Sequence, residues 1–169
     1  MTLDIFENET KYLPANDTWR GLVTKSLLVE QGYLLHEGNK VARIRITTHP
    51  DGMRVPKFEI KLPRTSEGVP EYPLSLGVEM ADMMMRDCGE RIIRKIRHHV
   101  YVNDRLFEID EFQGRYQPLV LIELERKGAQ AEVMELPTWV GRNVTDDIRF
   151  ANIWLAEHLV ESNMLGFQP

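Results

Sequence analysis

The chain has 169 residues, of which 43% are hydrophobic and 28% charged, a balance typical of one globular domain covering residues 1–169. The net charge of −5 argues against general attraction to nucleic acid or an anionic membrane. No apolar run is long enough for a bilayer, the N-terminus lacks a secretory signal, and the single cysteine, Cys88, fits a reducing cytoplasm.

Residues 7–13 (ENETKYL) are expected to form the first strand. Side chains alternate along a strand, so Glu7, Glu9 and Lys11 share one face. Two carboxylates about 7 Å apart on that face repel each other unless a positive group lies between them. Mg²⁺ and Mn²⁺ favour carboxylate oxygen. The stretch therefore predicts either a metal-binding strand face or a solvated face of mixed charge.

Alternating polar and apolar residues predict seven further strands, separated by turn signals such as the Gly-Asn and Asp-Gly pairs at 38–39 and 51–52. The expected strands cover residues 26–35, 41–47, 57–62, 71–76, 91–102, 105–112 and 119–125. Short turns imply antiparallel pairing. An up-and-down barrel or a strongly curved sheet is the natural architecture, because closure removes exposed edges.

Helical spacing of apolar residues predicts a helix over residues 78–88, which Gly89 ends. A short helix is expected over 129–136, and a last helix is expected to begin at Thr145 or Asp146 and to continue through Leu159. Together these elements define an α+β fold dominated by β-structure.

The polar faces of the strands carry both signs of charge. The cations are Lys11, Arg43, Arg45, Lys61, Lys95 and Arg97, and the acids are Glu7, Glu9, Glu59, Asp110, Glu123 and Glu125. Two cations ~5 Å apart at an effective dielectric of ~20 repel by about 3 kcal/mol. If the sheet closes around these faces, the cations share one lumen, and water, carboxylates or a bound polyanion must lie between them to offset their repulsion. A phosphate ester or anhydride with Mg²⁺ or Mn²⁺ satisfies that chemistry; if the sheet stays open, the same faces are simply solvated.

Seven segments, in order, resemble the motifs of the CYTH domain, or triphosphate tunnel metalloenzyme, superfamily. They are ENETK at 7–11 (ExExK), QGYL at 31–34, RIR at 43–45 (RxR), KIR at 95–97 (KxR), FEIDEF at 107–112, ELE at 123–125 (ExE) and the region 139–152, with EIK at 59–61 where the family has TxK. Each motif alone is weak, but their shared order is specific. The layout looks closest to the small bacterial inorganic triphosphatases.

This resemblance implies an eight-stranded antiparallel β-barrel tunnel with helices packed outside, which binds triphosphate substrates and uses Mg²⁺ or Mn²⁺. By position, it assigns the phosphates to Lys11, Arg43, Arg45, Lys61, Lys95 and Arg97. It assigns the metal or the attacking water to Glu7, Glu9, Asp110, Glu123 and Glu125. Lys95 and Tyr33 are the candidates for a catalytic lysine–tyrosine pair, and Arg149 is expected to reach the tunnel mouth.

Three positions depart from the family pattern. Val69-Pro70 stands where relatives often have an arginine, Pro73 replaces the second acid of an ExE pair, and Asn143 replaces a glutamate. These changes bear on a second metal site and on substrate preference.

The first functional hypothesis is a metal-dependent hydrolase of inorganic tripolyphosphate. A class IV adenylate cyclase, which releases cyclic AMP and pyrophosphate from ATP, is the second, and a non-catalytic binder of nucleotide or polyphosphate is the third. The expected partners are a small-molecule triphosphate or nucleotide and a second copy of the chain in a homodimer, with neither nucleic acid nor membrane.

Overall fold

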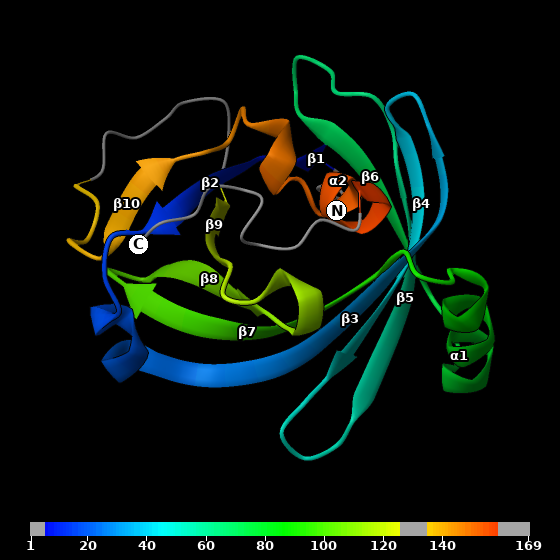
Figure 1. The fold of residues 1–169 in the computed structure, drawn as a ribbon, viewed down its shortest axis with the longest axis horizontal. Helices are drawn as coiled ribbons and strands as arrows, with labels where there is room; N and C mark the ends of the chain where they lie inside the picture. Colours follow the sequence, from blue (N-terminus) through cyan, green and yellow to red (C-terminus); the bar gives the residue numbers. More distant parts are fainter. Residues whose placement is uncertain (1–5, 126–134, 159–169) are drawn as a thin grey trace.

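The computed structural model describes residues 6–125 and 135–158. Ten strands form one antiparallel sheet (Figure 1). They are β1 (Phe6–Glu7), β2 (Glu9–Pro14), β3 (Val23–Glu37), β4 (Lys40–Thr48), β5 (Arg54–Lys61), β6 (Val69–Ser75), β7 (Ile92–Val102), β8 (Arg105–Phe112), β9 (Val120–Glu125) and β10 (Val140–Asn143). Hydrogen-bonded neighbours follow the order β1-β6-β5-β4-β3-β7-β8-β9-β2-β10. The expected β-dominated α+β fold is confirmed.

The expected first strand is divided into two at Asn8. Its first half, β1, pairs with β6, where Phe6 lies opposite Pro70. Its second half, β2, pairs with β9, where Glu9 lies opposite Glu125. This division and the additional strand β10, which was not among the strands predicted from the sequence, raise the number of strands from eight to ten. Among the described residues the pairing order ends at β1 and β10 without closing.

Helix α1 (Val78–Asp87) matches the expected helix over 78–88 and stands outside the curved sheet beside β5 (Figure 1). Its buried Ala81 packs against Ile44 and Ile46, which alternate with the arginines of β4 and so face outward. A Cβ at Gly32 would lie 2.6 Å from Cys88 Sγ. Glycine at this position therefore allows the end of α1 to approach β3 closely.

The C-terminal helix begins later than expected. A separate 3₁₀ turn, η3 (Ile148–Phe150), comes first, and Asp147 Oδ1 accepts a hydrogen bond from the Arg149 backbone N–H at 3.2 Å. Ala151 is extended (φ −75°, ψ 130°), which separates η3 from α2 (Asn152–His158). The last helix therefore begins at Asn152 rather than at 145 or 146.

Helix α2 packs on the inner face of the sheet, opposite to the outer face that α1 covers. Its Leu155 and Ala156 are buried with Tyr33 and Phe112. Tyr33 lies directly across from Arg43, and Phe112 from Lys95, so both belong to the polar, inner face. The expectation that the helices pack outside is correct for α1 and wrong for α2.

Two further 3₁₀ turns, η1 (Thr18–Leu22) and η2 (Gly114–Tyr116), complete the described elements. The helix expected over 129–136 falls mostly on residues 129–134, outside the described part of the chain. In the part that is described, no helix is both long and apolar enough to cross a membrane.

Candidate active site

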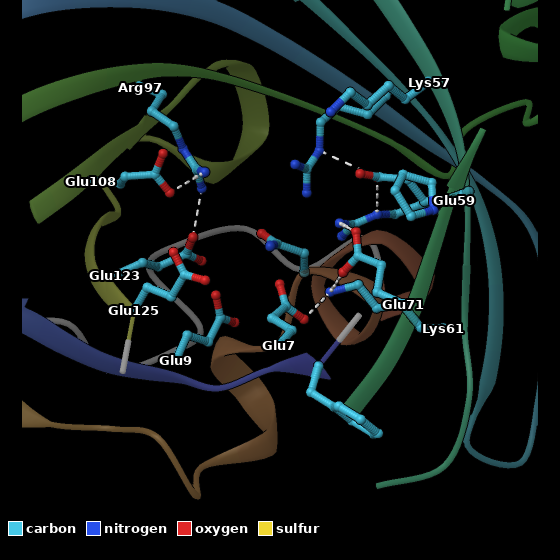
Figure 2. A pocket seen from close by; sticks show the side chains of 15 residues that line it. Glu7, Glu9, Lys57, Glu59, Lys61, Glu71, Arg97, Glu108, Glu123 and Glu125 are labelled. Atoms are coloured by element: carbon cyan, nitrogen blue, oxygen red, sulfur yellow. Dashed lines mark hydrogen bonds and ion pairs between the residues drawn. The ribbon is translucent and has the colours of Figure 1, made fainter. Parts of the chain in front are cut away.

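A polar cavity of about 420 Å³ lies on the inner face of the sheet (Figure 2). It is lined by Phe6, Glu7, Glu9, Arg43, Arg45, Lys57, Glu59, Lys61, Glu71, Pro73, Arg97, Glu108, Glu123, Glu125 and Asn152. Seven of these residues are glutamates and five are lysines or arginines. The described part of the wall therefore carries more formal negative than positive charge.

Cross-strand register brings the opposite charges together. Arg43 on β4 lies directly across from Glu59 on β5, and Lys11 on β2 lies across from Glu123 on β9. Directly opposed residues of an antiparallel pair have side chains on the same face. Alternation along each strand thus places the charges inside, while the intervening apolar residues face the outer core.

One side of the cavity is rich in carboxylates: Figure 2 shows Glu9, Glu123 and Glu125 gathered there. Lys11 Nζ lies 2.7 Å from Glu9 Oε1 and 2.8 Å from Glu123 Oε1. Burial raises the pKa of the Glu9 carboxyl, and the charge of Glu123 raises it further, while Lys11 opposes both. One ammonium therefore does not neutralise this group of acids.

These acids are hard oxygen donors, the ligands that Mg²⁺ and Mn²⁺ prefer. Among residues 6–125 and 135–158, however, no three His, Cys, Asp or Glu side chains converge tightly enough to hold a metal ion. Glu7, for example, turns toward Lys61 in an ion pair. The donor chemistry fits a divalent cation, and binding one requires these side chains to exchange lysine partners for the metal.

Behind the acidic side lies a buried charge network. Arg97 donates hydrogen bonds to Asp110 Oδ1 at 2.7 Å and to Glu123 Oε2 at 2.5 Å, and Lys95 also pairs with Asp110. The side chains of Lys95 and Asp110 are only 1% and 0% exposed. Burial lowers the pKa of Lys95, while the charge of Asp110 opposes this effect. The network fixes Arg97 and Glu123, which do line the cavity.

The other side of the cavity is more basic. Glu59 Oε2 lies 2.7 Å from Arg43 Nε and 3.4 Å from Arg45 Nε, and Lys61 Nζ lies 3.0 Å from Glu71 Oε2. Burial acts to raise the pKa of Glu59, but Arg43 and then Arg45 lower it to about 2. Glu59 is therefore ionised throughout the neutral range and holds both arginines toward the cavity.

The structure brings most of the sequence-derived candidates to one place. Eight of them line the cavity: Glu7, Glu9, Arg43, Arg45, Lys61, Arg97, Glu123 and Glu125. Lys11 and Asp110 lie one ion pair behind the wall, and Lys95 lies behind Asp110. Tyr33 is buried deeper, and its hydroxyl accepts a hydrogen bond from Gln31 Nε2 at 2.5 Å.

Arg149 lies apart from this group. Its side chain is 48% exposed, and its Nη2 lies 2.6 Å from Asp147 Oδ2. Arg149 is not among the described residues that line the cavity, and its reach to the tunnel mouth stays a prediction.

Sequence reasoning left several lining residues without a role in the site. Glu59 was expected among the acids of the polar faces but was assigned no ligand role, and Glu108 and Lys57 follow the same strand alternation. Asn152 had no periodic signal, but it is the last residue of the family-like segment 139–152 and was assigned no role there. Of the departures from the family pattern, Pro73 lines the cavity, whereas Asn143 accepts a hydrogen bond from the Thr145 backbone N–H at 2.9 Å and serves a turn.

No protein-family model matches the chain. An inorganic triphosphatase of Acetivibrio thermocellus is 30% identical over 150 residues, which is 86% of this chain and 90% of the relative. An inorganic triphosphatase of Nitrosomonas europaea is 36% identical over 90 residues, covering 51% of this chain and 58% of that protein. The crystal structure of an inorganic triphosphatase superposes with a TM-score of 0.63 and 28% identity, over 89% of this chain and 93% of that one.

A curved antiparallel sheet with a cavity of paired lysines, arginines and glutamates on its inner face is the arrangement of a phosphate-binding protein. With a relative 30% identical along most of both chains, the protein belongs to the CYTH, or triphosphate tunnel metalloenzyme, superfamily, together with bacterial inorganic triphosphatases.

Proposed function

We propose that this protein hydrolyses inorganic triphosphate to orthophosphate and pyrophosphate with the help of Mg²⁺ or Mn²⁺. The observation that carries the proposal is the charged inner cavity in a chain whose relatives are inorganic triphosphatases. Its volume of about 420 Å³ lies within the usual range of small-molecule sites. A cytoplasmic location and a homodimer stay sequence-based predictions.

The proposal includes a closed, eight-stranded tunnel. The break at Asn8 supports closure, because one segment pairs with β6 through β1 and with β9 through β2. The seven strands from β6 to β9 lie between these two pairings in the sheet order. Counting β1 and β2 as one strand therefore gives an eight-stranded ring around the cavity.

The charge of the wall supports a need for a divalent cation. Seven glutamates against five cations would repel a triphosphate polyanion. Glu9, Glu123 and Glu125 would hold the metal, with Glu7 and Asp110 as further candidates. When bound, the metal neutralises charge on the phosphate oxygens and makes the phosphorus easier to attack.

The basic residues of the wall bind and orient the phosphates. Arg43, Arg45 and Arg97 offer paired N–H donors that match phosphate oxygens, and Lys61 adds a point charge. Behind the wall, Lys11 holds the carboxylate of Glu123 in place and Lys95 holds that of Asp110. The same donors stabilise the charge that builds up as water attacks phosphorus and the bridging P–O bond breaks.

The direct test is to incubate the purified protein with inorganic triphosphate, ATP or thiamine triphosphate, each with Mg²⁺, Mn²⁺ or EDTA, and to identify the products. We expect orthophosphate release from triphosphate with either metal and none with EDTA. Cyclic AMP and pyrophosphate from ATP would indicate the cyclase instead. Saturable binding of all three compounds without turnover would indicate the non-catalytic binder.

A further inference from the structure

Two residues of the cavity wall carry buried polar atoms that have no hydrogen-bond partner among the described residues. They are Asn152 Oδ1, an acceptor, and Arg45 Nε, a donor that reaches Glu59 Oε2 only in a 3.4 Å ion pair without hydrogen-bond geometry. An unsatisfied buried polar atom costs about 1–3 kcal/mol. Such atoms in a native cavity wall suggest that a bound group completes them.

The position of Asn152 is fixed by its neighbours along the chain. Phe150 is 1% exposed and Leu155 is 0% exposed, and both are buried in the cluster that contains Tyr33 and Phe112. Ala151 is extended, so α2 begins at Asn152 itself. Apolar packing on both sides therefore holds this amide at the cavity wall at the cost of its own hydrogen bonding.

The two atoms require opposite kinds of partner. Arg45 Nε can donate to an oxygen of a phosphate group. Asn152 Oδ1 is a carbonyl oxygen that only accepts, so the ionised oxygens of a triphosphate cannot satisfy it. A water molecule in the cavity can, because it donates. A neutral amide also orients water without adding negative charge to a wall that already holds seven glutamates.

We propose that Asn152 positions the water that attacks the terminal phosphorus of triphosphate, an inference that rests on the proposed function. The Asn152 carbonyl accepts one O–H of the water and leaves an oxygen lone pair directed at phosphorus. The water oxygen forms the new P–O bond, the bridging P–O bond breaks, and its electron pair leaves on pyrophosphate. The proton released from water passes to a carboxylate of the wall.

The test compares Asn152→Ala and Asn152→Asp with the wild type for kcat and KM in triphosphate hydrolysis, and for triphosphate affinity by calorimetry. Asn152→Ala is expected to lower kcat by about 10–100-fold, with KM and affinity within about threefold of wild type. Asn152→Asp keeps an acceptor oxygen and is expected to recover kcat to within about tenfold of wild type. Asn143→Ala is the matched control, since the Asn143 amide faces Thr145, and should keep wild-type kcat.

Three results would overturn the inference. The first is an Asn152→Ala variant as active as the wild type. The second is weaker triphosphate binding by both variants, because the amide would then contact phosphate through its N–H. The third is a wild type without turnover, which would remove the proposed function as well. Unfolding curves of both variants show whether each is folded. If the alanine variant is not folded, kcat and triphosphate affinity of a folded Asn152→Asp still test the inference.

Discussion

Replacement of Glu9 by glutamine is expected to lower triphosphate hydrolysis at least about 100-fold, because it removes a charged oxygen ligand from the acidic side of the cavity. Glu9 lies next to Lys11 and opposite Glu125 in the sheet. Glutamine preserves the shape of the side chain, so a loss of activity would report on charge. The rate of orthophosphate release from triphosphate, with saturating Mg²⁺ or Mn²⁺, measures the loss of activity.

The same substitution is not expected to destabilise the fold. Burial and the charge of Glu123 raise the pKa of Glu9. A raised carboxyl pKa means that the ionised form is disfavoured in the folded state at neutral pH, so a neutral side chain removes a cost. In EDTA, the thermal midpoint of Glu9→Gln should equal or exceed that of the wild type. Glu37→Gln, on an exposed end of β3, is the control and should change neither property. A large drop in the midpoint would contradict this view of the acidic side.

Replacement of Glu59 by glutamine is expected to lower the free energy of unfolding at neutral pH by about 3 kcal/mol, because it leaves buried Arg43 without its nearest counter-charge. Arg43 and Glu59 are both almost fully buried and lie 2.7 Å apart. Urea denaturation of the two proteins measures the difference. Glu67→Gln, an exposed residue, provides a control that should match the wild type.

The cost of Glu59→Gln should depend on pH. The pKa of Glu59 is about 2 in the folded state, below its ordinary value of 4.5, so its ionised form contributes stability above pH 4.5. That contribution is lost as the pH falls from 4.5 through 2. At about pH 3 the difference between wild type and variant should shrink to about half of its neutral value. If the difference in free energy of unfolding between the two proteins stayed constant from neutral pH to about pH 3, the lowered pKa of Glu59 would be contradicted.

Strand alternation was enough to predict which side chains share the inner face. Arg43, Arg45 and Lys61 were placed on one polar face from spacing alone, and all three line the cavity. This works because the period of a strand is two, so each strand's charged set stays on one side once one face is buried. The order of motifs then predicted the superfamily correctly.

Other features depend on tertiary packing that spacing does not encode. Lys95 and Asp110 are buried behind the wall, where Asp110 pairs with both Lys95 and Arg97, and no local pattern reveals this arrangement. The break at Asn8 arises because the two halves of one strand pair with different neighbours. The late start of α2 follows from a local 3₁₀ turn that also pairs Arg149 with Asp147.

The position of α2 has a direct bearing on the site. From its apolar spacing alone, a helix can cover either face of a sheet. Here Leu155 and Ala156 pack with Tyr33 on the inner face, which brings Asn152 to the cavity wall. The sequence contains the residues for this arrangement, but only the three-dimensional structure shows that α2 completes the cavity.

The most direct test of the account is a crystal structure of the protein with triphosphate and Mn²⁺, with manganese located by its anomalous diffraction. We expect a manganese peak beside Glu9, Glu123 and Glu125, and phosphate density beside Arg45 and Arg97. The account would be contradicted if the manganese peak and the phosphate density both lay elsewhere. One such place is the second cavity, of about 390 Å³, which is lined by Arg54, Arg86 and Arg94.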